Sequence, residues 1–236
     1  MVTALHCFFL RTLVTRGRIV ALGALGLVAV GLGFAIGLSE VDRPVNVTFG
    51  FISNYGLAGL APVTALVFGS AVFGDLIDDQ TLVHVWLRPV ARWRLAASAY
   101  AAVLSVVVPL VVVPLTVAAA LCRTGASVIV GTAIASTLAV AAYSALFCWL
   151  GLRLSRALVW GLVYILIWEG AIANVAAGLA RFALRLYTRS ILGSFTGGEV
   201  TVDFGVTRVV AVAVPIVVAT LAMLLTVRRL RRTDVA

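Results

Sequence analysis

The sequence predicts an all-α integral membrane protein, and two features of its composition carry this prediction. Of its 236 residues, 63% are apolar and only 11% are charged, and the mean hydropathy is +1.15. A soluble globular domain has about 45–50% apolar and about 25% charged residues. A chain of this length cannot enclose so much apolar surface in one water-soluble core, so we expect most of its helices to lie in a bilayer.

Six apolar runs are long enough to cross the hydrocarbon layer, which takes about 20 residues per helix. The predicted transmembrane helices are residues 19–39, 57–74, 95–122, 124–152, 157–180 and 207–227. The polar stretch before the second span, with Asn46, Thr48, Ser53 and Asn54, is predicted as an outer loop. Six crossings leave no room for a separate soluble domain, so residues 1–236 form a single transmembrane domain.

The first 18 residues are predicted to form an interfacial helix on the inner leaflet. Leu5, Phe8, Phe9 and Leu13 recur at helical spacing, and the arginines lie elsewhere on that helix, as in amphipathic helices at a membrane surface. The first five residues carry no positive charge, and no small-residue cleavage site follows them. The segment is therefore not a signal peptide.

The arginines orient the chain. All 18 basic residues are Arg, there is no Lys, and the net charge is +9. Basic charge of this size could indicate nucleic-acid binding in a soluble chain, but here the arginines adjoin apolar runs, so we expect no nucleic-acid partner. Twelve arginines lie on the side of the N-terminus and six on the other, which predicts that both termini are cytoplasmic. We expect a multi-pass protein of the plasma membrane, of bacterial origin.

The absence of Lys excludes several functions. A Walker A phosphate loop and a Schiff-base cofactor both need a lysine, so the chain holds no ATP or pyridoxal cofactor in those ways. The three cysteines, Cys7, Cys122 and Cys148, are too few and too far apart for a disulfide framework. No spacing indicates a metal site.

The loop between the second and third spans is the most informative segment. Its acids come first, and Leu82, Val85 and Trp86 then share one helical face. Pro89 ends this short helix. A solvated connector is the simpler interpretation of such a loop.

The order of these residues resembles the coupling region of type-two ABC exporter permeases, in which a charged segment, Gly-Thr-Leu, an apolar stretch and Pro-Val-x-Arg lie between spans two and three. The matching residues are Asp78, Asp79, Thr81, Leu82, Arg88, Pro89, Val90 and Arg92. Gln80 stands where the family usually has Gly, and the family's Lys a few residues later is absent.

This resemblance implies an N-terminal interfacial helix, a cytoplasmic coupling helix between spans two and three, and short outer helices before span six. It also implies ABC ATPase subunits as partners, which bind ATP and Mg²⁺ and hydrolyse the ATP, and a second permease copy or a homologous permease. The chain itself binds no cofactor and is not an enzyme. The apolar spans suit a hydrophobic or amphipathic substrate, such as a drug, an antibiotic or a lipid.

Glu169 is the only acid within a predicted span. A charge at that depth costs roughly 2.5–3.5 kcal/mol, so its side chain should face protein or water. Trp160, Tyr164 and Trp168 form an aromatic stripe beside it, and Asn174 follows. Two interpretations remain open: a polar point on the translocation path or dimer interface, and a structural hydrogen bond to a neighbouring helix.

The outer segment from 179 to 205 contains Arg181, Arg185 and Arg189 at intervals of four residues, which predicts an amphipathic helix. The resemblance implies an outer gate there, while a plain interfacial anchor is the alternative. On the first span, Ala29, Gly33 and Gly37 form a ridge of small residues typical of helix packing.

Two other classes of protein fit the sequence less well. An intramembrane serine protease needs Gly-x-Ser-x-Gly and a histidine in a span, and the sequence has neither. The acids from Asp75 to Asp79 resemble the Mg²⁺-binding cluster of a membrane prenyl- or phosphotransferase, but such an enzyme needs a second acidic cluster that faces the first, and the other cytoplasmic loops offer only Asp234. The remaining alternative is an ion-coupled secondary transporter that uses Glu169.

Overall fold

A computed structural model describes residues 2–39, 43–78, 91–172, 181, 183–200 and 206–232, and every regular element in them is helical. The predicted all-α class is therefore confirmed for this part of the chain. The elements are α1 (Val2–Leu13), α2 (Arg16–Leu38), α3 (Pro44–Phe51), the π-helix η1 (Ile52–Leu60), α4 (Ala61–Asp78), α6 (Arg92–Leu121), α7 (Ala126–Arg153), α8 (Ala157–Val163), the π-helix η2 (Tyr164–Ile172), α11 (Leu184–Gly193) and α12 (Arg208–Arg232).

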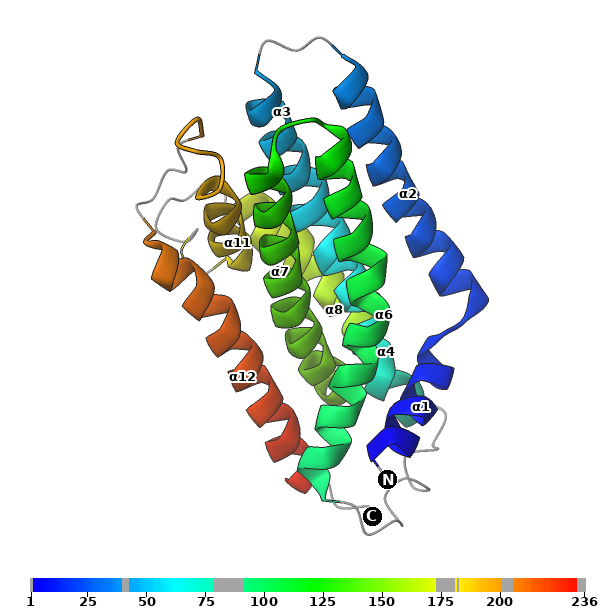
Figure 1. Cartoon of the computed structure of the whole chain (residues 1–236). Coiled ribbons are helices and arrows are strands. Elements are labelled where there is room, and N and C mark those ends of the chain that lie inside the picture. The colour runs from blue at the N-terminus through cyan, green and yellow to red at the C-terminus, as the bar shows by residue number, and fades with distance from the viewer. Residues whose placement is uncertain are drawn as a thin grey trace.

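The helices form an elongated bundle with α4, α6, α7 and α8 at its centre and with α2 and α12 on its flanks (Figure 1). Helix α1 and the last turns of α12 lie at one end, here called the α1 end. Helices α3 and α11 lie at the other, here called the α11 end. Among the described residues, 78% of the apolar stretch in Pro44–Asp75 is buried, against 22% in α2 and in α12.

Five helices of the described chain are long and apolar enough to cross a membrane: Arg16–Leu38, Pro44–Asp75, Arg92–Leu121, Ala126–Arg153 and Arg208–Arg231. By length and composition, these helices are compatible with the predicted multi-pass membrane protein. The predicted fifth span, 157–180, begins as an apolar helix over Ala157–Gly170 that is shorter than the other five, and residues 173–180 lie outside the described part. Six crossings stay a prediction.

The predicted outer loop before the second span is wrong. Asn46, Thr48, Ser53 and Asn54 all lie in α3 and η1, which continue directly into α4. Thr48 and Ser53 are buried inside the protein, and Asn54 accepts a hydrogen bond from α11, so these polar residues are placed by packing and by a partner. The π-helix η1 ends at Leu60, two residues before Pro62, whose ring disfavours the ordinary α-helical hydrogen bond of the preceding turn.

The predicted helix-packing role of the small-residue ridge on α2 is confirmed. A Cβ atom at Gly33 would lie 2.7 Å from the Cα of Ala118, and one at Gly37 would collide with the carbonyl oxygen of Leu121. Ala29, on the same face, is fully buried. Helices α2 and α6 therefore meet backbone to backbone, as small residues permit in membranes.

Helix α1 covers Val2–Leu13 of the helix predicted over the first 18 residues, and residues 16–18 belong to α2. The apolar face of α1 packs on protein. Leu5, Phe9 and Leu13 are buried, and the ring of Phe9 meets the ring of Phe73 on α4 edge to face at 6.2 Å. Only Phe8 of the predicted apolar face is exposed. The three cysteines are free, as expected, with Cys122 and Cys148 buried.

Candidate functional site

A polar junction lies where η2, α7 and α11 meet, and Glu169 is its centre. The Glu169 side chain is only 2% exposed. Its Oε1 accepts hydrogen bonds from the backbone N–H of Leu184 at 3.1 Å and from the hydroxyl of Tyr164 at 3.3 Å. Its Oε2 accepts the backbone N–H of Arg185 at 3.2 Å. We call this set, with Tyr143 and Asn54, the Glu169 junction.

The carboxyl group of Glu169 caps the N-terminus of α11. The first backbone N–H groups of a helix have no partner within the helix, and Ala183, at the N-cap position, has no side chain that could accept one. The carboxyl group of Glu169 takes two of these N–H groups from a different helix. A negative group here also lies at the positive end of the α11 dipole.

The π-helical turn brings Tyr164 to the same carboxyl group. A π-helix pairs residues five apart along the chain, and Tyr164 and Glu169 have that separation. The ring of Tyr164 also packs edge to face on Phe147 of α7, with centroids 6.4 Å apart. The π-helix is thus the local feature that makes the tyrosine a partner of the glutamate.

Arg185 joins the junction to the other π-helix, η1. Its guanidinium donates to Oδ1 of Asn54 on η1 at 2.5 Å, while the guanidinium of Arg189 stacks over the ring of Phe49 on α3 at 5.3 Å. Burial lowers the pKa of Arg185, and the nearby charge of Arg189 lowers it further. Because arginine normally titrates above about pH 12, Arg185 stays charged.

Tyr143 completes the junction from α7. Its side chain is fully buried, and its hydroxyl lies near the Glu169 carboxyl group without making a hydrogen bond of normal geometry. Ser53 on η1 is also buried, with a hydroxyl that bonds to none of the described residues. The α11 end therefore contains buried polar groups with unused hydrogen-bonding capacity, which are rare in folded proteins.

The residues predicted to lie beside Glu169 differ in their surroundings. Tyr164 bonds to it, and Trp168 is half-buried. Trp160 is 57% exposed on the outside of the chain, and the predicted aromatic stripe beside Glu169 stays a prediction. Asn174 lies outside the described residues.

The three predicted outer arginines do not all lie on one helix. Arg185 and Arg189 lie on α11 and point toward η1 and α3. Arg181 precedes the helix and is exposed, and its carbonyl oxygen accepts the hydroxyl of Tyr187.

Most of the predicted coupling segment lies outside the described residues: Asp79, Thr81, Leu82, Val85, Trp86, Arg88, Pro89 and Val90. Asp78 is the last residue of α4, and Arg92 is the first residue of α6. The structure therefore describes the two helix ends that flank this segment.

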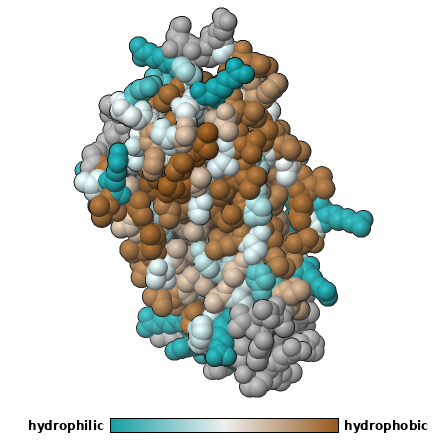
Figure 2. Space-filling model, in the orientation of Figure 1, coloured by the Kyte–Doolittle hydropathy of each residue, from teal (hydrophilic) through white to brown (hydrophobic). Residues whose placement is uncertain are grey.

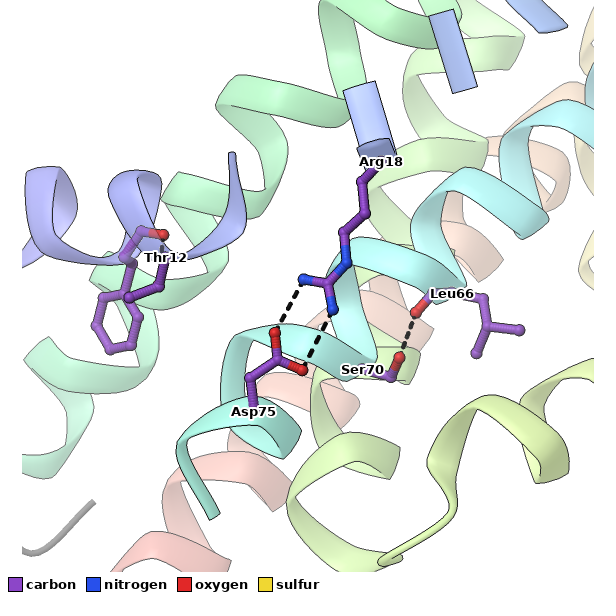
Figure 3. Close-up of polar contacts among 6 residues, drawn as sticks. Thr12, Arg18, Leu66, Ser70 and Asp75 are labelled. Atoms are coloured by element: carbon purple, nitrogen blue, oxygen red, sulfur yellow. Dashed lines mark hydrogen bonds and ion pairs between the residues drawn. The ribbon is translucent and has the colours of Figure 1, made fainter. Parts of the chain in front are cut away.

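A salt bridge that the sequence did not predict lies just before the segment. The two terminal nitrogens of Arg18 meet the two carboxylate oxygens of Asp75 at 2.9 and 3.4 Å, and Figure 3 shows the paired geometry. The bridge joins the start of α2 to the last turn of α4. Nothing in the sequence pairs these residues, because 57 positions separate them.

The sequence matches no protein-family model and no curated protein. Within the described residues, no three His, Cys, Asp or Glu side chains come close enough to hold a metal ion.

Proposed function

We propose that this chain is the permease subunit of an ATP-driven ABC exporter. The observation that carries the proposal is the ordered motif between α4 and α6. It runs from Asp78 and Asp79 through Thr81-Leu82 to Arg88-Pro89-Val90-x-Arg92. In this proposal the segment forms a coupling helix that binds a separate ATPase subunit, and the absence of any Lys fits a chain that relies on that subunit for ATP and Mg²⁺.

Contacts at the α1 end support a mechanical role for this segment. Helix α4 leads into it, and Arg18 and Phe9 both hold the last turns of α4, at Asp75 and Phe73. A push on the coupling helix would therefore act on α4 and α6 directly and on α1 and α2 through these contacts. The permease would pair with a second copy or a homologous permease, with the α1 end in the cytoplasm.

The substrate class follows from the character of the spans. The described helices that are long enough to cross a membrane are strongly apolar, and the Glu169 carboxyl group already accepts hydrogen bonds from Leu184, Arg185 and Tyr164. A hydrophobic or amphipathic molecule, such as a drug or a lipid, fits this environment better than a sugar. The outer arginines would then border its exit.

An ion-coupled secondary transporter is the alternative, and the burial of Glu169 favours it. In that mechanism Glu169 would take up and release a proton or cation. Because both of its oxygens hold the first turn of α11, each cycle would have to disturb that helix.

The test is co-purification of the chain in mild detergent with the ATPase subunit encoded in the adjacent reading frame. The wild type should retain the ATPase, and the double variant Asp79→Arg, Trp86→Ala should lose it. Glu199→Gln, an exposed change in the loop after α11, is the matched control and should retain it. Failure of the wild type to retain the ATPase in both detergent and nanodiscs would favour the ion-coupled alternative.

A further inference from the structure

An apolar groove opens between α6, α7 and α12. Its cavity has a volume of about 400 Å³, within the range of about 300–1,000 Å³ that is typical of ligand sites. The residues that line it are Tyr100, Leu138, Ala141, Pro215, Ile216, Ala219, Thr220 and Met223. They belong to helices that are apolar enough to span a membrane.

The groove offers an occupant almost no hydrogen bonds. The hydroxyl of Tyr100 donates to the carbonyl oxygen of Ala141 at 2.9 Å, and the hydroxyl of Thr220 donates to that of Ile216 at 2.8 Å. Both polar groups are thus satisfied by the walls themselves. Because a buried polar group without a partner is costly, the groove selects a hydrocarbon chain.

Arginines lie on both α6 and α12 beyond one end of the groove. At 1.5 Å per residue, Met223 lies about 8 Å along α12 from Arg228, and Tyr100 lies about 12 Å along α6 from Arg92. Arg94, Arg228 and Arg231 are exposed at this end. Figure 2 shows an apolar middle zone with hydrophilic residues at both ends of the molecule.

An exposed tryptophan marks the membrane boundary at the same end. Trp93 is 54% exposed at the start of α6, and the guanidinium of Arg94 lies 5.4 Å from its ring centre. Tryptophan is enriched at the level of the lipid headgroups. A chain in the groove would therefore have its headgroup beside these arginines.

We propose that this groove binds one acyl chain of an anionic phospholipid, with the lipid phosphate at the arginines of α6 and α12. Basic pockets between transmembrane helices hold anionic headgroups in this way. A second copy of this chain, placed parallel in the same membrane, would bring its own arginine-rich end to the same level. Charge complementarity thus favours the lipid. The proposal does not depend on the transport function.

The test uses the full-length wild-type chain in nanodiscs containing a phosphatidylglycerol with a photoactivatable group in the middle of one acyl chain. Peptides of α12 that contain residues 215–223, or peptides of α6 around Tyr100, should carry the label. Labelling confined to other helices, or cross-linked dimers through α12 in place of lipid adducts, would overturn the proposal.

A second measurement compares affinities for phosphatidylglycerol and for phosphatidylcholine with the same chains by native mass spectrometry. The double variant Arg228→Gln, Arg231→Gln should weaken phosphatidylglycerol binding roughly thirtyfold, since two arginines near an anionic surface, at about 1 kcal/mol each, contribute about 2 kcal/mol together. Arg123→Gln, at the opposite end, is the control and should bind as the wild type does. Equal affinities for the two lipids in the wild type would contradict the headgroup assignment and overturn the proposal.

A third variant fills the groove. Ala219→Phe should displace the chain and lower the affinity for both lipids, whereas Val217→Phe should not, because Val217 is 52% exposed on the same helix and does not line the groove. Unchanged lipid binding by a folded Ala219→Phe protein would overturn the proposal. If that variant does not fold, the photolabelling of the wild-type chain still shows whether the groove binds an acyl chain.

Discussion

Helices α2 and α12 flank the same bundle, and equal shares of their apolar stretches, 22%, are buried within the described chain. They are nevertheless held in different ways. Helix α2 meets α6 backbone to backbone at Gly33 and Gly37. Helix α12 packs on α6 and α7 but leaves a cavity of about 400 Å³ beside Ala219 and Met223.

Equal burial therefore does not mean equal packing. In a bilayer, lipid tails are as apolar as the helices, so close contact between small residues takes over the role that the hydrophobic effect has in water. On α2 the absence of side chains at two positions creates this contact. On α12, Pro215 and Ala219 line a space that the protein itself does not fill.

The largest expected effect is at Gly33. A leucine there would collide with the backbone of Ala118, whose Cα lies 2.7 Å from the position that a Cβ atom would take, and overpacking of this kind should cost about 3 kcal/mol. The measurement is the free energy of unfolding in detergent. Gly31→Leu is the matched control, because nothing lies within 4 Å of a Cβ at that position. Equal stability of the two variants would contradict the claim that α2 is held by backbone contact with α6 at Gly33.

Glu169→Ala should cause the next largest loss of stability, and the loss should appear in α11 and α12. Two backbone N–H groups of α11 lose their acceptor, which should cost about 1–3 kcal/mol. Because α11 packs against both α7 and α12, hydrogen exchange should become faster in α11 and in the adjoining turns of α12, with no change in α2.

The matched control for this variant is Glu199→Gln, since Glu199 is an exposed carboxylate in the following loop. If exchange at Leu184 and Arg185 did not change in Glu169→Ala, the capping role of Glu169 would be wrong.

A smaller effect is expected at the salt bridge that joins α2 to α4. Arg18 and Asp75 are 28% and 41% exposed, so water and salt screen their attraction, and the pair should contribute no more than about 1 kcal/mol. A double-mutant cycle with Arg18→Gln and Asp75→Asn measures it. The coupling energy should fall as the salt concentration rises. A value that does not depend on salt would indicate a pair shielded from solvent.

The smallest effect is expected at Thr220. Its hydroxyl bonds only to the carbonyl oxygen of Ile216 in its own helix, and its side chain is exposed at the groove. Thr220→Val should therefore change the free energy of unfolding by less than about 0.5 kcal/mol. A larger loss would mean that the groove wall is packed more tightly than its cavity indicates.

The membrane helices were predictable because hydropathy is a local property of the sequence. The error came at Asn46 to Asn54, where polar residues lower the local hydropathy while the backbone stays helical. Thr48 and Ser53 are buried by packing, and Asn54 accepts a hydrogen bond from Arg185, which lies 131 positions away. Pro62 follows η1 closely, but Pro109, Pro114 and Pro215 lie within ordinary α-helices, so no short motif predicts the π-helices.

The candidate site was predictable only in part. A single acid in an apolar segment must face protein or water, so the burial of Glu169 follows from its sequence context. Its partners do not, because they are backbone N–H groups on another helix. The absence of a capping side chain at Ala183 was the one available signal, but it could be interpreted only once the start of α11 was known.

The close approach at Gly33 and Gly37 constrains how the sequence can change during evolution. Each position has room for a hydrogen atom alone, and its neighbours are backbone atoms of Ala118 and Leu121, which no substitution on α6 can make smaller. A larger residue on α2 therefore has no compensating partner mutation. In sequences related to this chain, both positions should therefore stay glycine.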